Sequence, residues 1–359
     1  MALKIFERYL AREIHVATAL VLSAFMMLFA FFDLIGEIQN LGRGNYQLPE
    51  ALGYVSLTLP GRAYELFPIA VLIGSLYALT NLARHSEITV LRVSGLSTLS
   101  LLVTLVRIGI VYVALTFVFG EFIAPPAERA GQQLRLRAMS AVVAQDFRSG
   151  LWVRDEHSFI NVRSVSPDNR LQNVRVYVFG ERFRLEQIIE AADGVYEDVG
   201  HWRLGEVTQT RFENARASVV HLDEMVWRSA LTPDILSVLL VSPERMSLTN
   251  LYQYVRHLAG NRQKTERYEI AFWKKLIYPL SAMVMMVLAL PFGYLNSRQG
   301  GVSLKIFIGI MLGITFHMLN GLFSSLGAIN SWPPFWSAIT PGALFLTGAG
   351  ATLWWVERR

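Results

Sequence analysis

The sequence predicts a membrane α-helical protein with six transmembrane helices and an all-β domain inserted between the third and the fourth. The first observation is a stretch of about fifty residues between Lys305 and Glu357 without a charged side chain, broken only by the turn-like segment 327–334. Since a helix needs about 20 apolar residues to cross a bilayer, this stretch predicts two spans joined by a tight hairpin. The second observation is that four further apolar segments precede it. The third is a polar segment, 125–269, which divides the six spans into two groups of three.

The N-terminal membrane half, residues 1–124, begins with an amphipathic pattern. Leu3, Phe6 and Leu10 share one helical face and basic residues lie elsewhere, which is typical of an interfacial helix. The apolar run that follows lacks a small-x-small cleavage site, so we expect it to remain as a membrane anchor. The three spans of this half are expected at about 14–38, 60–83 and 97–124.

The segment between spans two and three predicts a short helix at about 84–94 that lies under the membrane, with Gly95 suited to its end. Leu82, Ile88 and Leu91 would face the membrane. Arg84, Glu87 and Arg92 would face the cytoplasm. Two interpretations stay open: a basic anchoring loop, or a coupling helix that docks into a groove of a cytoplasmic motor subunit, where Glu87 would meet a basic residue.

Residues 125–269 predict a β domain with a connecting helix. Runs of β-branched and aromatic residues indicate short strands at 152–153, 159–162, 174–178, 202–204 and 219–222. Turn clusters at 166–169, 192–194 and 199–200 are expected to separate strands. A spacing of about ten residues per strand fits either a sandwich or an open jelly roll. At 247–267 the pattern becomes helical and leads back to the membrane.

The C-terminal membrane half, residues 270–359, is expected to hold spans four to six at about 272–296, 304–326 and 334–356. Gly309 and Gly313 in the fifth span predict close packing against another helix of the chain. His317 and Asn320 are polar groups in the same span, and two interpretations stay open for them: satisfaction by neighbouring helices, or exposure to a substrate cavity.

Charge location predicts the orientation in the membrane. The segment 125–269 carries 19 Lys and Arg and 19 Asp and Glu, so the net charge of +5 comes from the membrane part. If six spans alternate, ten of the 14 bases in that part lie on the side of the N-terminus. Because short loops rich in Lys and Arg stay in the cytoplasm, we expect both termini there and the β domain outside. The pI near 9.4 then indicates membrane topology and not nucleic-acid binding.

Motifs for catalysis and for cofactor or metal binding are missing from the sequence. It has no cysteine, no phosphate-binding loop, no Gly-x-Ser-x-Gly elbow and no pair of histidines at a metal-ligand spacing. We therefore expect no catalytic, cofactor-binding or metal-binding residues in this chain.

Short motifs along the whole chain resemble one family. They are FERY at 6–9, GRGNY at 42–46, LARHSE at 82–87 with SG at 94–95, GEFIAP at 120–125, SGLW at 149–152, LTPD at 231–234, and WKK at 273–275 followed by PLS at 279–281. The order and spacing of these motifs, together with the predicted topology, resemble the LptF/LptG family of lipopolysaccharide export permeases. Within this family, the resemblance is closer to the LptG members.

The resemblance implies a bacterial inner-membrane subunit with a periplasmic β-jelly roll between spans three and four. It implies a complex with an ATPase dimer (LptB), a related permease (LptF) and a single-span partner (LptC). The substrate would be lipopolysaccharide, passed to a periplasmic bridge toward the outer membrane. ATP would be used by the partner and not by this chain.

Five bases at or just beyond the outer ends of spans are candidates for binding the phosphates of such a lipid. They are Arg43, Arg62, Arg135, Lys274 and Lys275. Lys274 and Arg135 also match the family pattern. Some relatives carry lysines at the outer end of span one, where this chain has Asp33, Gln39 and Asn40. Asp33 and Glu37 share a helix face there, and we expect them to pair with Arg43, Arg62 or a partner chain, or to reach water.

Two other classes of membrane protein share parts of this pattern. A permease for another lipid or for lipoproteins would usually place its outer domain after the first of four spans. A membrane sensor with an outer β domain would need a cytoplasmic output module, and no cytoplasmic segment here exceeds about twenty residues. The layout disfavours both.

Overall fold

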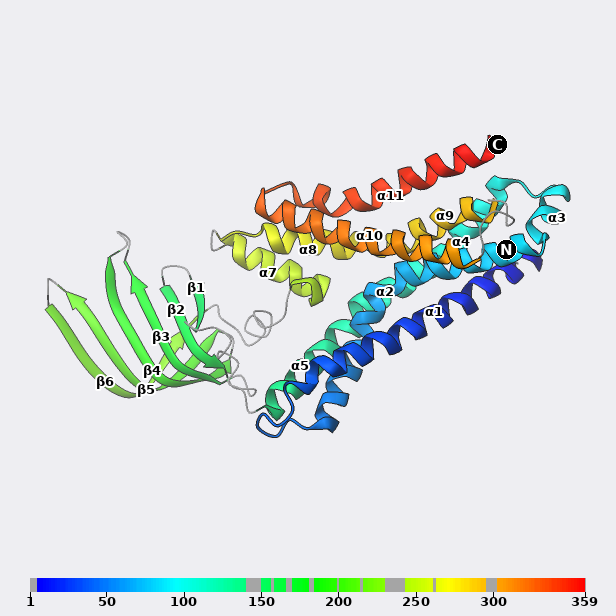
Figure 1. The fold of residues 1–359 in the computed structure, drawn as a ribbon. Coiled ribbons are helices and arrows are strands. Elements are labelled where there is room, and N and C mark those ends of the chain that lie inside the picture. The colour runs from blue at the N-terminus through cyan, green and yellow to red at the C-terminus, as the bar shows by residue number, and fades with distance from the viewer. Residues whose placement is uncertain are drawn as a thin grey trace.

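The computed structural model describes residues 5–139, 150–155, 158–165, 170–180, 184–198, 200–213, 216–229, 243–260, 263–294 and 302–358. A bundle of long helices carries a separate β-sheet at one end, while both chain ends and the short helix α3 lie at the other (Figure 1). The predicted combination of apolar helices with an inserted β domain is confirmed. The LTPD motif at 231–234 lies outside the described residues.

The first half of the bundle contains α1 (Ile5–Ile38), α2 (Leu48–Arg84), α3 (Glu87–Val93), α4 (Thr98–Val118), the π-helical turn η1 (Phe119–Ile123) and α5 (Ala124–Ala138). The expected interfacial helix is not separate, because α1 runs without a break from Ile5. Its first turns are held in the bundle instead. Leu10 is buried in the main core, and the Glu7 carboxylate lies 3.3 Å from the Arg107 guanidinium of α4.

Helix α4 continues through η1 into α5, past Pro125, where the β domain was expected to begin. Pro125 and Pro126 stand in the first turn of α5, directly after the π-helical turn. In η1, Gly120 lies against the ring of Tyr64, where a Cβ atom would come within 2.5 Å of Tyr64 Cε2. The first of the described strands begins at Leu151, and α5 extends the third apolar helix toward the sheet.

The second half contains the 3-10 turn η3 (Pro243–Arg245), α7 (Leu248–Gly260), α8 (Glu266–Ile277), α9 (Leu280–Tyr294), α10 (Val302–Ile329) and α11 (Pro334–Glu357). Helices α8 and α9 meet at 53° next to Pro279, where the Tyr278 hydroxyl donates a 2.7 Å hydrogen bond to the Glu65 carbonyl of α2. Among the described residues, five helices are long and apolar enough to cross a membrane, and the bent α8–α9 pair would make a sixth.

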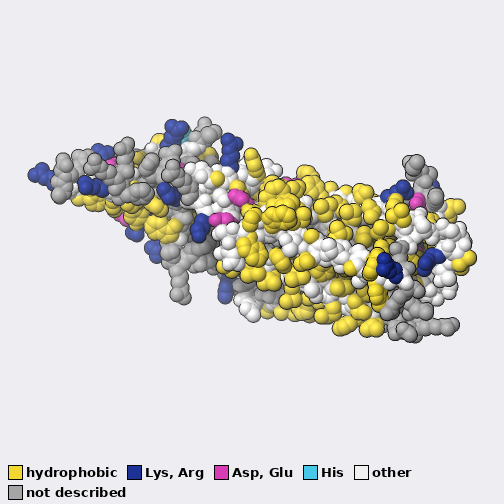
Figure 2. Space-filling model, turned by 90° about the horizontal axis from the view of Figure 1, so that it is seen from above, with side chains coloured by type: hydrophobic (Ala, Val, Ile, Leu, Met, Phe, Trp, Pro, Cys, Tyr) yellow, Lys and Arg dark blue, Asp and Glu magenta, His cyan; other side chains and the backbone are white. Residues whose placement is uncertain are grey.

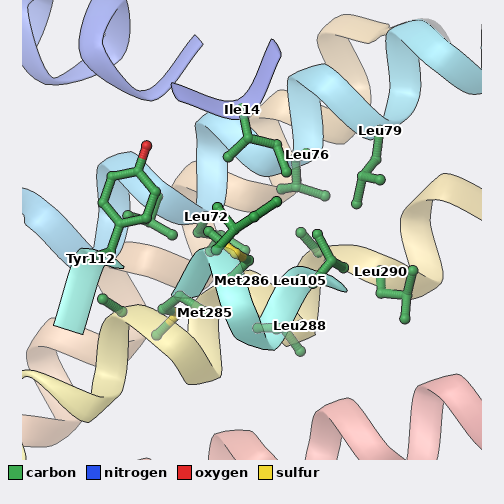
Figure 3. Packing of buried hydrophobic residues seen from close by; sticks show 14 of the residues in the cluster. Ile14, Leu72, Leu76, Leu79, Leu105, Tyr112, Met285, Met286, Leu288 and Leu290 are labelled. Carbon is green, nitrogen blue, oxygen red and sulfur yellow. The ribbon is translucent and has the colours of Figure 1, made fainter. Parts of the chain in front are cut away.

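The core of the bundle forms where α1, α2, α4 and α9 meet (Figure 3). Leu72, Leu76 and Leu105 are fully buried there beside Met285 and Met286. Small residues let the helices approach closely. Gly309 and Gly313 of α10 face Leu76 and Ile69 of α2, where added Cβ atoms would come within 2.4 and 2.9 Å, so the predicted internal packing of this glycine pair is confirmed.

The β domain is one antiparallel sheet in sequential order. Its strands are β1 (Leu151–Asp155), β2 (Ser158–Val165), β3 (Leu171–Phe179), β4 (Leu185–Asp198), β5 (His201–Glu213) and β6 (Arg216–Arg228). Each described strand pairs with the strand that follows it in the sequence, so the six strands form an open, curved meander. They do not form the two facing sheets of a sandwich. Trp202, Leu204 and Ile160 are fully buried in its core.

The expected turn at 192–194 is wrong. These residues lie inside β4, where Gly194 pairs with Leu171 of β3 and with Leu204 of β5. Pairing on both sides satisfies the backbone of this polar segment better than a turn would. The expected turn at 199–200 is confirmed at Gly200, which has a φ of 77°. The cluster at 166–169 lies outside the described residues.

The bundle exposes apolar side chains to its surroundings. Figure 2 shows a hydrophobic surface along the helices, with Lys and Arg gathered toward its ends. In the most apolar 18-residue segment of α1, no residue is buried within the chain. In the corresponding segment of α11, only 11% of the residues are buried. These faces therefore suit lipid or another membrane helix, and not water.

Candidate functional site

A cavity of about 270 Å³ opens at the end of the bundle nearest the sheet. We call it the sheet-side pocket. It is lined by charged side chains from α1, α2, α5, η3 and α8: Asp33, Glu37, Arg62, Glu65, Glu128, Arg135, Glu244, Arg245 and Lys275. Three of the five predicted phosphate-binding bases, Arg62, Arg135 and Lys275, are thus brought together. Five acidic groups nevertheless outnumber the four bases in this pocket, so it is not a simple cationic site.

Arg62 of α2 is held by a carboxylate of α1. Its Nη2 and Nε donate hydrogen bonds of 2.7 and 2.9 Å to the two carboxylate oxygens of Asp33, a bidentate arrangement that fixes the guanidinium plane. The two side chains are 29% and 20% exposed, and the Arg62 guanidinium also lies over the ring of Phe29. The expected pairing of Asp33 with Arg62 is confirmed.

Glu37 has a different basic partner from those expected. Its carboxylate lies 3.4 Å from Arg135 Nε of α5 and accepts 3.0 Å hydrogen bonds from the Tyr46 hydroxyl and the Asn40 amide. Burial, and then the neighbouring Glu37 carboxylate, raise the pKa of Tyr46 above its ordinary value. The Arg135 guanidinium also lies 5.2 Å from the centre of the Tyr54 ring. Glu37 therefore joins α1, the following loop and α5.

Three contacts attach the returning chain, η3 and the start of α7, to the bundle. Arg245 forms an ion pair with the buried Glu128 of α5. The Lys275 ammonium donates a hydrogen bond to the Met246 carbonyl. The Glu121 carboxylate accepts hydrogen bonds of 2.8 and 3.1 Å from the Leu248 amide, which caps the N-terminus of α7. We call this set the linker clamp.

The other two predicted bases lie elsewhere. Lys274 lines a second cavity between α8 and α10, and Arg43 is an exposed residue whose guanidinium donates to the Asn40 side chain at 3.2 Å. Neither lines the sheet-side pocket. Lys274 and Lys275 separate because successive residues of a helix point about 100° apart.

Sequence reasoning missed three acidic members of the pocket, Glu65, Glu128 and Glu244, and the basic Arg245. Glu128 was counted only among the balanced charges of the segment 125–269, yet its side chain is only 5% exposed. The one available signal was its place a few residues after the apolar run of span three, since a carboxylate there needs a partner.

At the opposite end of the bundle, α3 follows α2 after a left-handed Ser86 with a φ of 62°. Arg84 belongs to the last turn of α2, and Glu87 begins α3. The Arg92 guanidinium lies 5.0 Å from the centre of the Tyr294 ring at the end of α9. Ile88, which was expected to face the membrane, is instead buried in the core of the bundle, and Gly95 has a φ of 95°.

Helix α3 also presents an apolar surface that the sequence reasoning did not single out. Val90 and Val93 are 62% and 86% exposed. The two residues are three apart, so they share one side of this short helix.

The two polar residues singled out in span five have different surroundings. The Asn320 amide is buried and donates to the Phe316 carbonyl of its own helix at 3.4 Å. His317 is exposed on the surface of α10. Neither lines the sheet-side pocket.

Comparison with known proteins identifies the family. The family model described as lipopolysaccharide export system permease LptF/LptG matches residues 8–355. The lipopolysaccharide export system permease protein LptG of Haemophilus influenzae is 29% identical over 355 residues, which cover 98% of each chain. The protein of that name from Escherichia coli K12 is 29% identical over 358 residues, or 99% of this chain and 98% of the relative. The chain, with its apolar helices and its inserted sheet, therefore belongs to the LptF/LptG family of lipopolysaccharide export permeases.

Proposed function

We propose that this permease crosses the inner membrane six times, with both termini in the cytoplasm and the sheet in the periplasm. The bent α8–α9 pair supplies the sixth span in this topology. The proposed orientation is supported by the position of α3 and both chain ends. They lie opposite the sheet, on the side that holds most bases of the membrane part. The sheet-side pocket then faces the outer leaflet.

The chain works as one subunit of an ABC transporter, in which ATP is hydrolysed by a partner. The proposed complex holds an ATPase dimer (LptB), a related permease (LptF) and a single-span subunit (LptC). Support for an ATPase contact comes from α3, which exposes Val90 and Val93 at the cytoplasmic end and carries Glu87 at its start. An apolar patch with a charge beside it suits the groove of a partner.

The substrate phosphates meet Arg62, Arg135 and Lys275 in the sheet-side pocket. The observation that carries this assignment is that carboxylates of a single helix, α1, hold both guanidinium groups. A phosphate that displaces Asp33 or Glu37 would keep each arginine paired, because bidentate contacts suit carboxylate and phosphate alike. Movement of α1 would thereby be linked to lipid entry.

Site-specific crosslinking of lipopolysaccharide to the assembled complex tests the pocket. Arg62→Glu with Arg135→Glu should remove most of the crosslink, since two repulsive charges replace two attractive ones, while assembly stays intact. Arg8→Glu with Arg12→Glu, at the opposite end of α1, is the matched control and should retain the crosslink. Equal loss in both pairs would place the headgroup elsewhere.

Copurification of an ATPase tests the coupling role of α3. Glu87→Arg with Val93→Asp should abolish recovery of the ATPase and leave the permease inserted, because both side chains change at the proposed contact. Thr89→Asp, an exposed position on the same helix, is the control for added charge. Normal recovery and transport by the double variant would refute the docking role.

A further inference from the structure

The second cavity, which we call the α8–α10 cavity, has a volume of about 340 Å³. Arg267 and Lys274 line it from α8, Glu244 lines it from η3, and Ser324 and Ser325 line it from α10. Its remaining walls are apolar: Ile270, Ala271, Ala328 and Ile329. Arg267 and Lys274 are seven residues apart, so they lie about two turns apart on the same side of α8.

The charges around this cavity form no ion pair or hydrogen bond with another described residue. Lys274 is half-buried and lies within the electrostatic influence of Glu244, whereas Arg267 and Glu244 are exposed. The neighbouring Lys275, by contrast, donates to the Met246 carbonyl. A half-buried ammonium without a hydrogen-bonded counter-ion is costly, so Lys274, with the exposed Arg267 and Glu244 beside it, suits a ligand that carries both signs.

Aromatic side chains place the cavity at the level of lipid headgroups. Trp273 of α8 packs edge to face on Phe335 at the start of α11, with ring centres 5.2 Å apart. Trp332 precedes α11, and Trp336 in its first turn is 63% exposed. Tryptophan gathers at membrane interfaces, where its ring meets both acyl chains and headgroups. Ile329, which lines the cavity, is 77% exposed and offers an apolar path from it to the bilayer.

We propose that the α8–α10 cavity binds the phosphoethanolamine headgroup of a glycerophospholipid of the surrounding bilayer, separately from the transported lipid. The phosphate lies between Lys274 and Arg267, with the Ser325 hydroxyl as a further donor. The primary ammonium lies against Glu244, and the acyl chains leave past Ile329 along the apolar surface of α10. A headgroup with one anionic and one cationic end matches these charges, whereas a purely anionic headgroup would meet Glu244 unfavourably.

The test uses the full chain in its complex, reconstituted in nanodiscs that contain equal amounts of phosphatidylethanolamine, phosphatidylcholine and phosphatidylglycerol with the same acyl chains. Native mass spectrometry then measures which lipids the released complex retains. We expect retained phosphatidylethanolamine, and about a tenfold lower occupancy in Lys274→Gln, since a charge-assisted contact is lost. Lys264→Gln, an exposed residue that does not line the cavity, is the matched control and should behave as the wild type.

Glu244→Gln gives a result that misfolding does not produce: it should shift retention from phosphatidylethanolamine toward phosphatidylglycerol. Equal lipid retention in Lys274→Gln and Lys264→Gln would overturn the proposal. Loss of the lipopolysaccharide crosslink in Lys274→Gln, with phosphatidylethanolamine unchanged, would overturn it as well, because the cavity would then belong to the substrate. The crosslink to the sheet-side pocket should persist in Lys274→Gln, because Lys274 does not line that pocket, so this inference and the proposed substrate site fail independently.

Discussion

The pairing of Arg62 with Asp33 connects two helices through two hydrogen bonds of 2.7 and 2.9 Å. Asp33→Asn should destabilise the protein by about 1–3 kcal/mol, because the guanidinium stays partly buried without its carboxylate. The double variant Asp33→Asn with Arg62→Gln should cost less than the sum of the two single changes. Thermal unfolding of all four proteins in detergent measures this coupling, and additive losses would show that the pair contributes nothing.

The hydroxyl of Tyr46 is a second residue-scale test, because it donates to Glu37 from a fully buried side chain. Folding raises the pKa of this tyrosine, so the neutral phenol is favoured more strongly in the folded state than in the unfolded chain. Its contribution to stability is complete below the unfolded pKa of about 10 and is lost as the pH rises above that value. Unfolding between pH 8 and 11 should therefore show a smaller loss of stability in Tyr46→Phe than in the wild type, whereas identical slopes would contradict this role.

At the scale of elements, α1 crosses α2 at Gly74. A Cβ atom there would come within 2.7 Å of the Thr18 backbone of α1, which, unlike a side chain, has no rotamer through which to move away. Gly74→Ala should separate the two helices and cost about 1–3 kcal/mol. Gly321→Ala in α10, where nothing lies within 4 Å, should have no such cost. Thermal unfolding compares the two variants. Equal unfolding midpoints would mean that α1 shifts away from α2 without a loss of stability.

The helices that cross the membrane could be predicted because long apolar runs leave few alternatives. Strand β4 was harder, since Asp193 and Gly194 suggest a turn, and only pairing with β3 and β5 makes the segment extended. The candidate site divides similarly. Paired charges near helix ends predicted the contact of Asp33 with Arg62, but not the separation of Lys274 from Lys275, which depends on how α8 is rotated against its neighbours.

At the scale of the whole molecule, the linker clamp supplies the polar contacts between the returning chain and the bundle, beside the apolar packing of α7 on α8. Glu121→Gln with Glu128→Gln should loosen η3 and α7, because an amide neither pairs with Arg245 nor caps α7 as well as a carboxylate does. Hydrogen exchange should increase at residues 246–252 and stay unchanged in β3 to β5. The exposed pair variant Glu190→Gln with Glu197→Gln is the control, and unchanged exchange at 246–252 in the clamp variant would exclude this role.

The π-helical turn η1 sets the angular phase of everything that follows it on the same helix. Its wide turn, closed by the Ala124 amide on the Phe119 carbonyl, holds one residue more than an α-helical turn. Each residue of a helix advances the side chains by about 100°, so one residue fewer here would rotate α5 by that angle. Glu128 and Arg135 would then point away from α1 and η3, although every residue of α5 would be unchanged. A helical wheel drawn from Thr98 to Ala138 is consequently out of phase with the real faces after Val118, and a one-residue gap at this place would matter more than most substitutions in α5.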